Sequence, residues 1–212
     1  MLGIKGFGCP APSCSKDSSP GIVIPVKDKR MVATDEDRRR IVQSQNGDPG
    51  AFEALIRDHQ RMIHSLCYRM SGSLADAEDL AQETFIHAYQ HLEGFRAEAQ
   101  FSSWLYRIAV NLCLNWQKRR NRLDQLHKDW SEQERESSGD DAVRAQQIQD
   151  ALLKLPPKQR AAVVLTTYDG LTHVEAAAAL GCSETTVSWR LFAARGKLKR
   201  WLTDHVKAGT LQ

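Results

Sequence analysis

Residues 171–191 read LTHVEAAAALGCSETTVSWRL, and this stretch has the clearest local pattern in the 212-residue chain. Thr172, followed three residues later by Glu175, is the signature of a capping box, which marks the start of a helix. Gly181 occupies a place where the chain must turn with a positive φ, and Ser183 can cap a second helix. The stretch therefore predicts two helices joined by a tight turn.

The two faces of the second helix predict its role. The small residues 176–179 let the helices pack closely, with Leu180, Val187 and Leu191 facing inward. The outer face then carries Glu184, Thr185, Thr186, Ser188, Trp189 and Arg190. In a DNA-binding helix-turn-helix, the second helix enters the major groove and meets base edges and phosphates. The alternative is a plain helical hairpin with an alanine-rich contact.

Basic side chains continue the same helix at Arg195, Lys197, Lys199 and Arg200. A run of charges is usually a solvated face, but this one directly extends a candidate recognition helix. Its side chains can follow a phosphate backbone, which favours the DNA-binding interpretation.

The whole chain reads as an all-α protein with two small helical domains, because no strand-like alternation occurs. Residues 1–33 are rich in Gly, Pro and Ser and predict a disordered tail. The first domain is predicted over 34–122 and the second, with the helix-turn-helix, over 144–208. Residues 123–143 are acidic and have no apolar stripe, which predicts a flexible linker.

Helix signals divide the first domain into parts. Asp48 is a good N-cap because Pro49 follows it at the first helical position. Residues 71–73 read Ser-Gly-Ser and break that helix, and a second helix is predicted from about 74 to 92. A third is expected to begin after Ser102. In the second domain, helix is predicted from Ala145 to Leu155, where two prolines stop it.

Composition excludes several classes of protein. No apolar run approaches the about 20 residues that span a bilayer, and the N-terminus lacks the apolar core of a signal peptide, so a cytoplasmic protein without membrane insertion is expected. Cys67, Cys113 and Cys182 sit in apolar helical patterns and are predicted to be buried free thiols. Cys9 and Cys14 lack a second pair at zinc-site spacing, so no metal and no cofactor are expected.

Aromatic and cationic side chains are interleaved at the end of the first domain. The aromatics are Phe95, Phe101, Trp104, Tyr106 and Trp116, and the cations are Lys118, Arg119, Arg120 and Arg122. Such a mixture suits single-stranded nucleic acid, in which bases stack and phosphates pair with cations. For Phe101 and Trp104, packing in the core is at least as good an explanation.

Five segments together resemble the extracytoplasmic-function sigma factors. They are DAEDLAQETFIHAY (76–89), Phe95-Arg96, FSSWLYRIAVN (101–111), LPPKQR (155–160) and the helix-turn-helix, in the order and spacing of that family. The likeness covers about Asp35 to Val206. It implies a transcription initiation factor that brings core RNA polymerase to promoter DNA and is not itself an enzyme.

The resemblance also implies partners and site residues. The first domain would bind the clamp helices of the polymerase β′ subunit through Asp79, Gln82, Glu83 and Phe85. It would melt the −10 element with Arg96, Ala97, Glu98, Ala99, Gln100, Asn111, Lys118, Arg119, Arg120 and Arg122. The second domain would meet the β flap and read the −35 duplex with Glu184, Thr185, Thr186, Ser188, Trp189, Arg190, Arg195 and Lys197. An anti-sigma factor is the usual restraint in this family.

Two alternatives stay open at this stage. A helix-turn-helix regulator that acts without polymerase is the first, and the segments 76–89 and 95–111 argue against it. An enzyme such as a nucleic-acid hydrolase is the second, and the sequence has no metal-ligand cluster, Gly-rich phosphate loop or paired nucleophile and base. One departure from the family is expected to weaken phosphate contacts, because Ser188 and Ala194 stand where relatives often have a basic residue.

Overall fold

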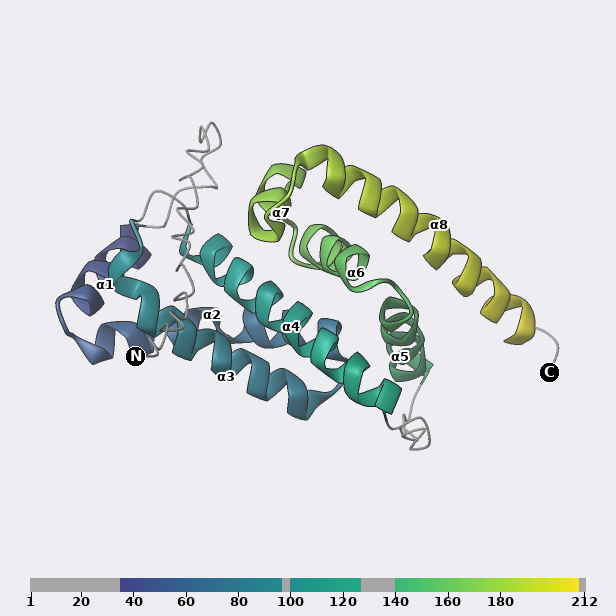
Figure 1. Cartoon of the computed structure of the whole chain (residues 1–212), viewed down its shortest axis with the longest axis horizontal. Helices are drawn as coiled ribbons and strands as arrows, with labels where there is room; N and C mark the ends of the chain where they lie inside the picture. The colour runs from purple at the N-terminus through teal and green to yellow at the C-terminus, as the bar shows by residue number, and fades with distance from the viewer. Residues whose placement is uncertain (1–34, 97–99, 127–139, 210–212) are drawn as a thin grey trace, which may run out of the picture.

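The computed structural model describes residues 35–96, 100–126 and 140–209, and every regular element in them is helical (Figure 1). The predicted all-α fold is therefore confirmed. The first half contains α1 (Asp35–Gln45), α2 (Pro49–Ser71), α3 (Leu74–His91), the short 3-10 turn η1 (Leu92–Gly94) and α4 (Phe101–Leu126). The second half contains α5 (Asp140–Leu153), α6 (Pro157–Val163), the π-helical turn η2 (Val164–Tyr168), α7 (His173–Leu180) and α8 (Glu184–Gly209).

Local side-chain chemistry sets the helix ends of the first half. The Asp48 carboxylate accepts the backbone N–H of Gly50 at 2.9 Å, which confirms the predicted N-cap of α2. Gly72 ends α2 in the left-handed conformation, with φ 79°. Ser73 then caps α3 by accepting the N–H of Asp76 at 3.3 Å. Each cap satisfies a backbone group that the helix end leaves unpaired.

The two helices that border the predicted linker are longer than the sequence indicated. α4 continues to Leu126, and α5 begins at Asp140, so both ends of the 123–143 segment are helical. No glycine or proline interrupts the end of α4. Residues 127–139, the predicted tail and the last three residues lie outside the part that the structure describes.

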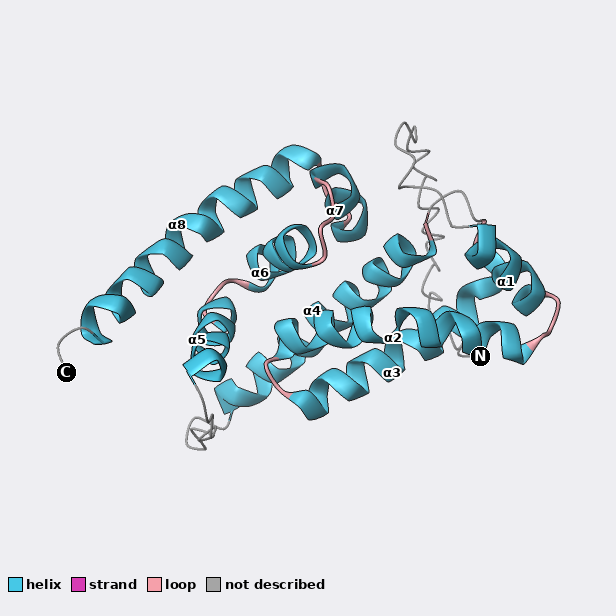
Figure 2. Ribbon diagram, turned by 180° about the vertical axis from the view of Figure 1, so that it is seen from behind, coloured by secondary structure: helices cyan, strands magenta, loops and turns pink. Residues whose placement is uncertain are grey.

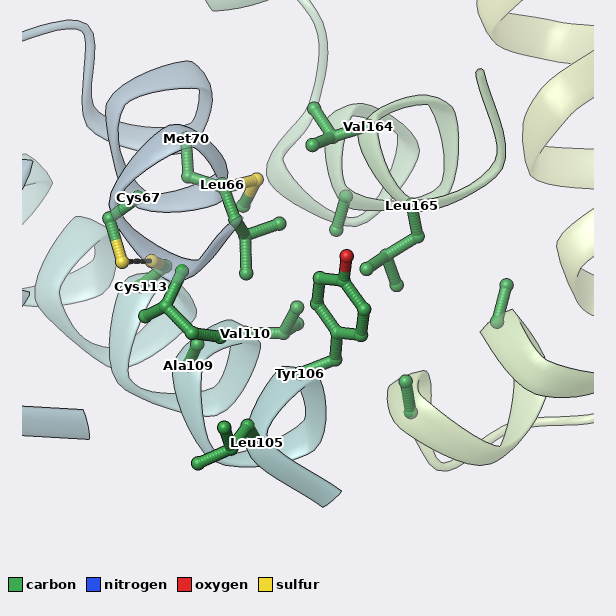
Figure 3. Close-up of a cluster of buried hydrophobic side chains, with 14 of the residues drawn as sticks. Leu66, Cys67, Met70, Leu105, Tyr106, Ala109, Val110, Cys113, Val164 and Leu165 are labelled. Atoms are coloured by element: carbon green, nitrogen blue, oxygen red, sulfur yellow. Dashed lines mark hydrogen bonds between the residues drawn. The ribbon is translucent and has the colours of Figure 1, made fainter. Parts of the chain in front are cut away.

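The two helical groups pack against each other. Figures 1 and 2 show α6 and α7 beside α4, with α5 near the end of α2. Buried side chains of both groups form one continuous apolar cluster. In Figure 3, Tyr106 of α4 points toward Leu165 of the second group, and Val164 lies above it. Two domains were expected from the sequence, but this contact between them was not.

Asp169, a carboxylate near this contact, has a raised pKa. Asp169 follows η2, is half-buried, and its Oδ2 atom is enclosed without a hydrogen-bond partner. Burial raises its pKa from 3.8 to about 7, although the positive charge of Arg69 on α2 partly opposes that rise. Tyr106 of α4 also interacts with Asp169, because burial and the Asp169 charge both raise the pKa of that phenol.

A raised carboxyl pKa makes stability depend on pH in a definite direction. The charged form of Asp169 is disfavoured in the fold, so the cost appears above the unfolded pKa of 3.8 and is complete above about 7. We therefore expect the melting temperature of Asp169→Asn, relative to the parent, to rise by at least about 2 °C between pH 4.5 and pH 8. Thermal melts of both proteins, with the exposed Asp79→Asn as control, measure this. Melting temperatures that change with pH in the same way for the parent and Asp169→Asn would contradict this expectation.

Candidate nucleic-acid and protein-binding interfaces

The helix-turn-helix has the local geometry that its sequence predicted. The Glu175 carboxylate accepts the N–H of Thr172 at 2.7 Å, and the Thr172 hydroxyl accepts the N–H of Glu175 at 3.3 Å, so the capping box is complete. Gly181 makes the turn with φ 58°. Ser183 caps α8 by accepting the N–H of Thr186 at 3.3 Å. These contacts fix the start of α7, the turn and the start of α8.

α8 has one buried face and one face open to solvent. Val187, Leu191 and Ala194 form the buried face, each at most 3% exposed. Most of the residues predicted to read DNA are exposed, namely Glu184, Thr185, Ser188, Trp189 and Arg195, whereas Thr186, Arg190 and Lys197 are half-buried. The structure thus places all eight predicted −35 contacts off the buried face of the helix.

Two of these side chains are positioned by the preceding elements. Arg190 donates from Nη1 to the sulfur of Cys182 at 3.4 Å, so it is tethered to the turn instead of projecting freely. Ser188 Oγ lies 3.1 Å from Nδ1 of His173, at the start of α7. Ala194 is fully buried and Ser188 is exposed, so only Ser188 of these two positions faces solvent; the expectation of weaker phosphate contacts stays a prediction.

A large exposed aromatic next to this face was missed from the sequence. Phe192 is 80% exposed, and Trp189, three residues earlier on the same helix, is 64% exposed. Residues three apart on a helix are neighbours, so the two rings form an apolar patch beside Arg195. The sequence already indicated this exposure, because Phe192 does not fall on the apolar stripe formed by Val187 and Leu191.

α4 presents a polar stripe to solvent. Arg107, Asn111, Asn115, Lys118 and Arg122 are all exposed and recur at intervals of three or four residues, which places them on one face. Asn111 lies inside the helix, well away from either end. It therefore does not cap a turn in the core, the alternative explanation for an asparagine at this place. Arg107 and Asn115 extend the predicted set.

The two other predicted phosphate-binding arginines lie on a neighbouring face of α4. Arg120 forms an ion pair with Asp76 of α3 at 3.4 Å, and its guanidinium lies 5.2 Å above the ring of Trp116. Arg119 lines the same surface depression between α3 and α4. These two cations thus border the acidic side of α3, in contrast to the open stripe.

The aromatic residues before and within α4 form a stacked cluster. The ring of Phe95 lies 4.9 Å from that of Trp104, and Phe101 lies 5.6 Å from Trp104. Phe101 is 1% exposed, so the core interpretation holds for it. Trp104 is half-buried and keeps part of its ring at the surface.

The segment that leads into α4 is described only at its two ends. Arg96 is exposed, and Gln100 is half-buried. The Gln100 carbonyl accepts the N–H of Trp104 at 3.2 Å, and its side-chain oxygen accepts the Ser102 hydroxyl at 3.2 Å, so Gln100 starts the helix. Three further residues predicted to contact the −10 element lie between Arg96 and Gln100, outside the described ranges: Ala97, Glu98 and Ala99.

The four residues predicted to bind polymerase do not share one face of α3. Asp79 is exposed and Glu83 half-buried, and both line the depression that contains Arg119. Gln82 is exposed on the opposite side, toward α2. Phe85 is only 9% exposed, because it falls on the apolar stripe of the helix. Gln82 and Phe85 therefore lie on the α2 side of the helix, whereas Asp79 and Glu83 lie on its α4 side.

A groove between α2 and α3 joins several of these side chains. It consists of two adjoining depressions of about 420 and 460 Å³ that share Ile56, Gln82 and Phe85 as lining residues. Ile86 and Tyr89 border it and are 49% and 57% exposed. The exposed apolar edge was missed from the sequence, although both residues lie off the core stripe of α3. A groove of this kind suits an amphipathic partner helix.

The cysteines and other potential ligands form no metal centre in the described ranges. No group of three His, Cys, Asp or Glu side chains converges in residues 35–96, 100–126 and 140–209. Cys67 and Cys113 are buried with their sulfurs 3.9 Å apart, and Cys182 is half-buried and free. Cys9 and Cys14 precede the first described residue. None of the helices in those ranges has the length and apolar character needed to cross a bilayer.

The two helical groups match two known protein families. The family "Sigma-70 region 2" matches residues 55–123, and "Sigma-70, region 4" matches residues 145–198. The chain is 35% identical over 182 residues to the ECF RNA polymerase sigma factor SigE of Mycolicibacterium smegmatis, covering 81% of this chain and 70% of that protein. It is 34% identical to SigW of Bacillus subtilis, covering 79% of this chain and 97% of SigW.

Solved structures agree with these sequence matches. CnrH, in complex with the cytosolic domain of CnrY, superimposes with a TM-score of 0.63 at 28% identity, covering 80% of this chain and 99% of CnrH. The sigma factor RpoE, in complex with the anti-sigma factor NepR from Bartonella quintana, gives 0.63 at 25% identity, covering 72% and 96%. The chain belongs to the extracytoplasmic-function (ECF) family of RNA polymerase sigma factors.

Proposed function

We propose that the N-terminal helices hold core polymerase and the unwound −10 strand at the same time, while α8 reads the −35 duplex. One observation carries this division: the residues that line the α2–α3 groove all belong to α2 and α3, whereas the polar stripe lies on α4. Two partners can therefore bind one small domain without competing. The protein acts by binding, as an initiation factor, and a regulator that works without polymerase is not favoured.

The groove between α2 and α3 is the proposed site for the clamp helices of the β′ subunit. Its floor is apolar at Ile56 and Phe85, and Gln82 supplies a hydrogen-bonding group at its edge. Ile86 and Tyr89 add exposed apolar area that a partner helix would cover. Asp79 and Glu83 lie on the other side of α3, in the depression that Arg119 also lines, and would meet basic groups of the polymerase outside the groove. The β flap is the proposed partner of the C-terminal domain.

The stripe on α4 is the proposed site for the −10 strand. The Asn111 amide both donates and accepts, so it can read the Watson–Crick edge of a base that has left the stack. Lys118 and Arg122 follow on the same face and can pair with phosphates. Removing a base from a duplex costs a few kcal/mol, which stacking and hydrogen bonds in the site must offset.

The C-terminal domain is the proposed −35 reader, and Arg190 provides its test. Its tether to the Cys182 sulfur orders the guanidinium before DNA binds, which suits a base contact worth about 1–3 kcal/mol. We expect Arg190→Ala to weaken binding of reconstituted holoenzyme to a −35 duplex on the order of 5- to 150-fold. Arg57→Ala, on the exposed side of α2, is the matched control.

Promoters for this experiment come from sequencing the transcripts that wild-type holoenzyme initiates. An equal loss on specific and scrambled −35 duplexes would reduce Arg190 to a phosphate contact. If the wild-type chain with core polymerase gave no promoter-specific transcripts, the proposed function itself would fail.

Regulation by a protein partner is also proposed. The two solved relatives are in complex with the cytosolic domain of CnrY and with the anti-sigma factor NepR. We infer that an anti-sigma protein restrains this chain as well.

A further inference from the structure

The connection from α3 to α4 begins with residues 92–96, called here the entry segment. It contains the three-residue turn η1, and the N–H of Phe95 donates to the carbonyl of Leu92 at 3.0 Å. Short 3-10 turns of this kind have weaker hydrogen-bond geometry than an α-helix. The segment ends in Arg96, which is exposed and is predicted to contact the −10 element. The position of Arg96 therefore depends on contacts that other elements make to the entry segment.

Gln45, the last residue of α1, bonds to the entry segment on both sides of its turn. Its amide nitrogen donates to the carbonyl of Leu92 at 2.8 Å and to that of Phe95 at 3.0 Å. Both distances are normal for N–H···O bonds, and one amide group has the two N–H donors that they need. The bonds join residues 47 and 50 positions apart in the sequence. They link the entry segment to α1.

α1 is itself held against α2, so Gln45 extends from a fixed element. Ile41 of α1 is 1% exposed and belongs to the apolar core. On the surface, Arg40 forms an ion pair with Asp58 of α2. A side chain at the end of a helix packed in this way can hold a neighbouring segment in one place.

Phe95 is held through its ring as well as through its carbonyl. The ring lies 4.9 Å from that of Trp104 and 5.7 Å from that of Phe101, which is 1% exposed. The carbonyl of Phe95 and the N–H of Arg96 belong to the same planar peptide unit. The bond from Gln45 therefore fixes the peptide from which the Arg96 side chain extends.

We propose that Gln45 is a positioning residue for recognition of the unwound −10 strand, an inference that rests on the proposed function. A guanidinium can stack on an unstacked base, and a group that is ordered in advance loses less conformational freedom on binding. Gln45 orders the Phe95–Arg96 peptide before DNA binds. Both of its N–H groups are used by the two carbonyls, so it acts through Arg96 and not by direct contact with the strand.

The test removes the donors of Gln45 while keeping the shape of its side chain. Gln45→Glu places a carboxylate against the carbonyl oxygens of Leu92 and Phe95, which repel it. Gln43→Glu makes the same change at an exposed position of α1 and is the matched control. The probe is a labelled single strand with the −10 sequence of a promoter that wild-type holoenzyme uses. We expect Gln45→Glu to weaken binding of this strand to reconstituted holoenzyme about fivefold or more, and Gln43→Glu to bind it as the parent does.

An uncharged variant and a double variant complete the test. Gln45→Met keeps the length of the side chain without a donor or a charge, and should weaken strand binding about threefold. Combined with Arg96→Ala, it should cause no loss beyond that of Arg96→Ala alone, because Gln45 acts through Arg96. Affinity for core polymerase and for a −35 duplex should stay at the parent's value, since the entry segment lines neither of those sites.

Three results would overturn the inference. They are unchanged strand affinity in both Gln45 variants, additive losses in the double variant, and equal losses of strand, core and −35 binding. The last would show that Gln45 supports the fold as a whole. A wild-type holoenzyme that bound the −10 strand no better than a scrambled strand would instead contradict the proposed function, so the two failures are distinguishable.

Discussion

Ile86→Asp is expected to weaken binding to core polymerase at least about tenfold and to abolish promoter-directed transcription at limiting protein. Ile86 is 49% exposed at the edge of the α2–α3 groove, so the substitution leaves the core of the domain intact. A carboxylate there would have to be desolvated beneath the partner helix without a counter-charge, and an uncompensated buried charge costs several kcal/mol. A tenfold loss corresponds to only about 1.4 kcal/mol.

The chain offers a close control for this substitution. Val42 on α1 is 50% exposed, nearly the same as Ile86, and lines neither depression of the groove. Val42→Asp should therefore bind core as the parent does. Affinity can be measured by fluorescence anisotropy of labelled factor titrated with core enzyme. Equal losses for Val42→Asp and Ile86→Asp, or no loss for either, would place the polymerase contact elsewhere.

Asn111→Ala is expected to reduce open complex about tenfold while closed-complex formation stays nearly intact. The physical reason is that a base is available to the amide only after it leaves the duplex, so the contact forms late. Open complex is followed by permanganate reactivity of thymines near −10. A promoter melted in advance should restore part of the activity, because strand opening no longer has to be driven. It should not restore the base preference at −10.

Measurements of thermal stability distinguish a DNA-contacting role of Asn111 from a structural role. Asn111 is exposed on α4, and substitution by alanine, the best helix former, should not lower the melting temperature. A lowered melting temperature, with equal loss of activity on duplex and pre-melted promoters, would assign Asn111 to the fold instead of the DNA.

Local chemistry in the sequence was sufficient for the elements and their ends. The capping box of Thr172 and Glu175, the positive φ at Gly181 and the Asp48 cap all involve groups within a few residues of each other. Such contacts form whenever the segment is helical, so the pattern of residues alone predicts them. The same holds for the buried stripe of Val187 and Leu191, which follows from the helical repeat.

Surface placement was only partly predictable, because it depends on which helices pack together. Phe85 was grouped with three polar residues of α3, yet it belongs to the floor of a groove that α2 completes. Ile86 and Tyr89 are exposed because no described helix covers that side of α3. Periodicity identifies an apolar stripe, but not how much of its edge a neighbouring helix leaves open.

The contact between the domains was decided by tertiary structure alone. Arg160 reads from sequence as part of a family motif, and Gln149 as one of several glutamines on a helix. Their partners are backbone carbonyls of residues 68–70, 80 to 90 positions earlier in the chain. A carbonyl has the same chemistry in every residue, so no side-chain pattern marks it as an acceptor. Only the packing of α5 and α6 against the end of α2 brings those donors to it.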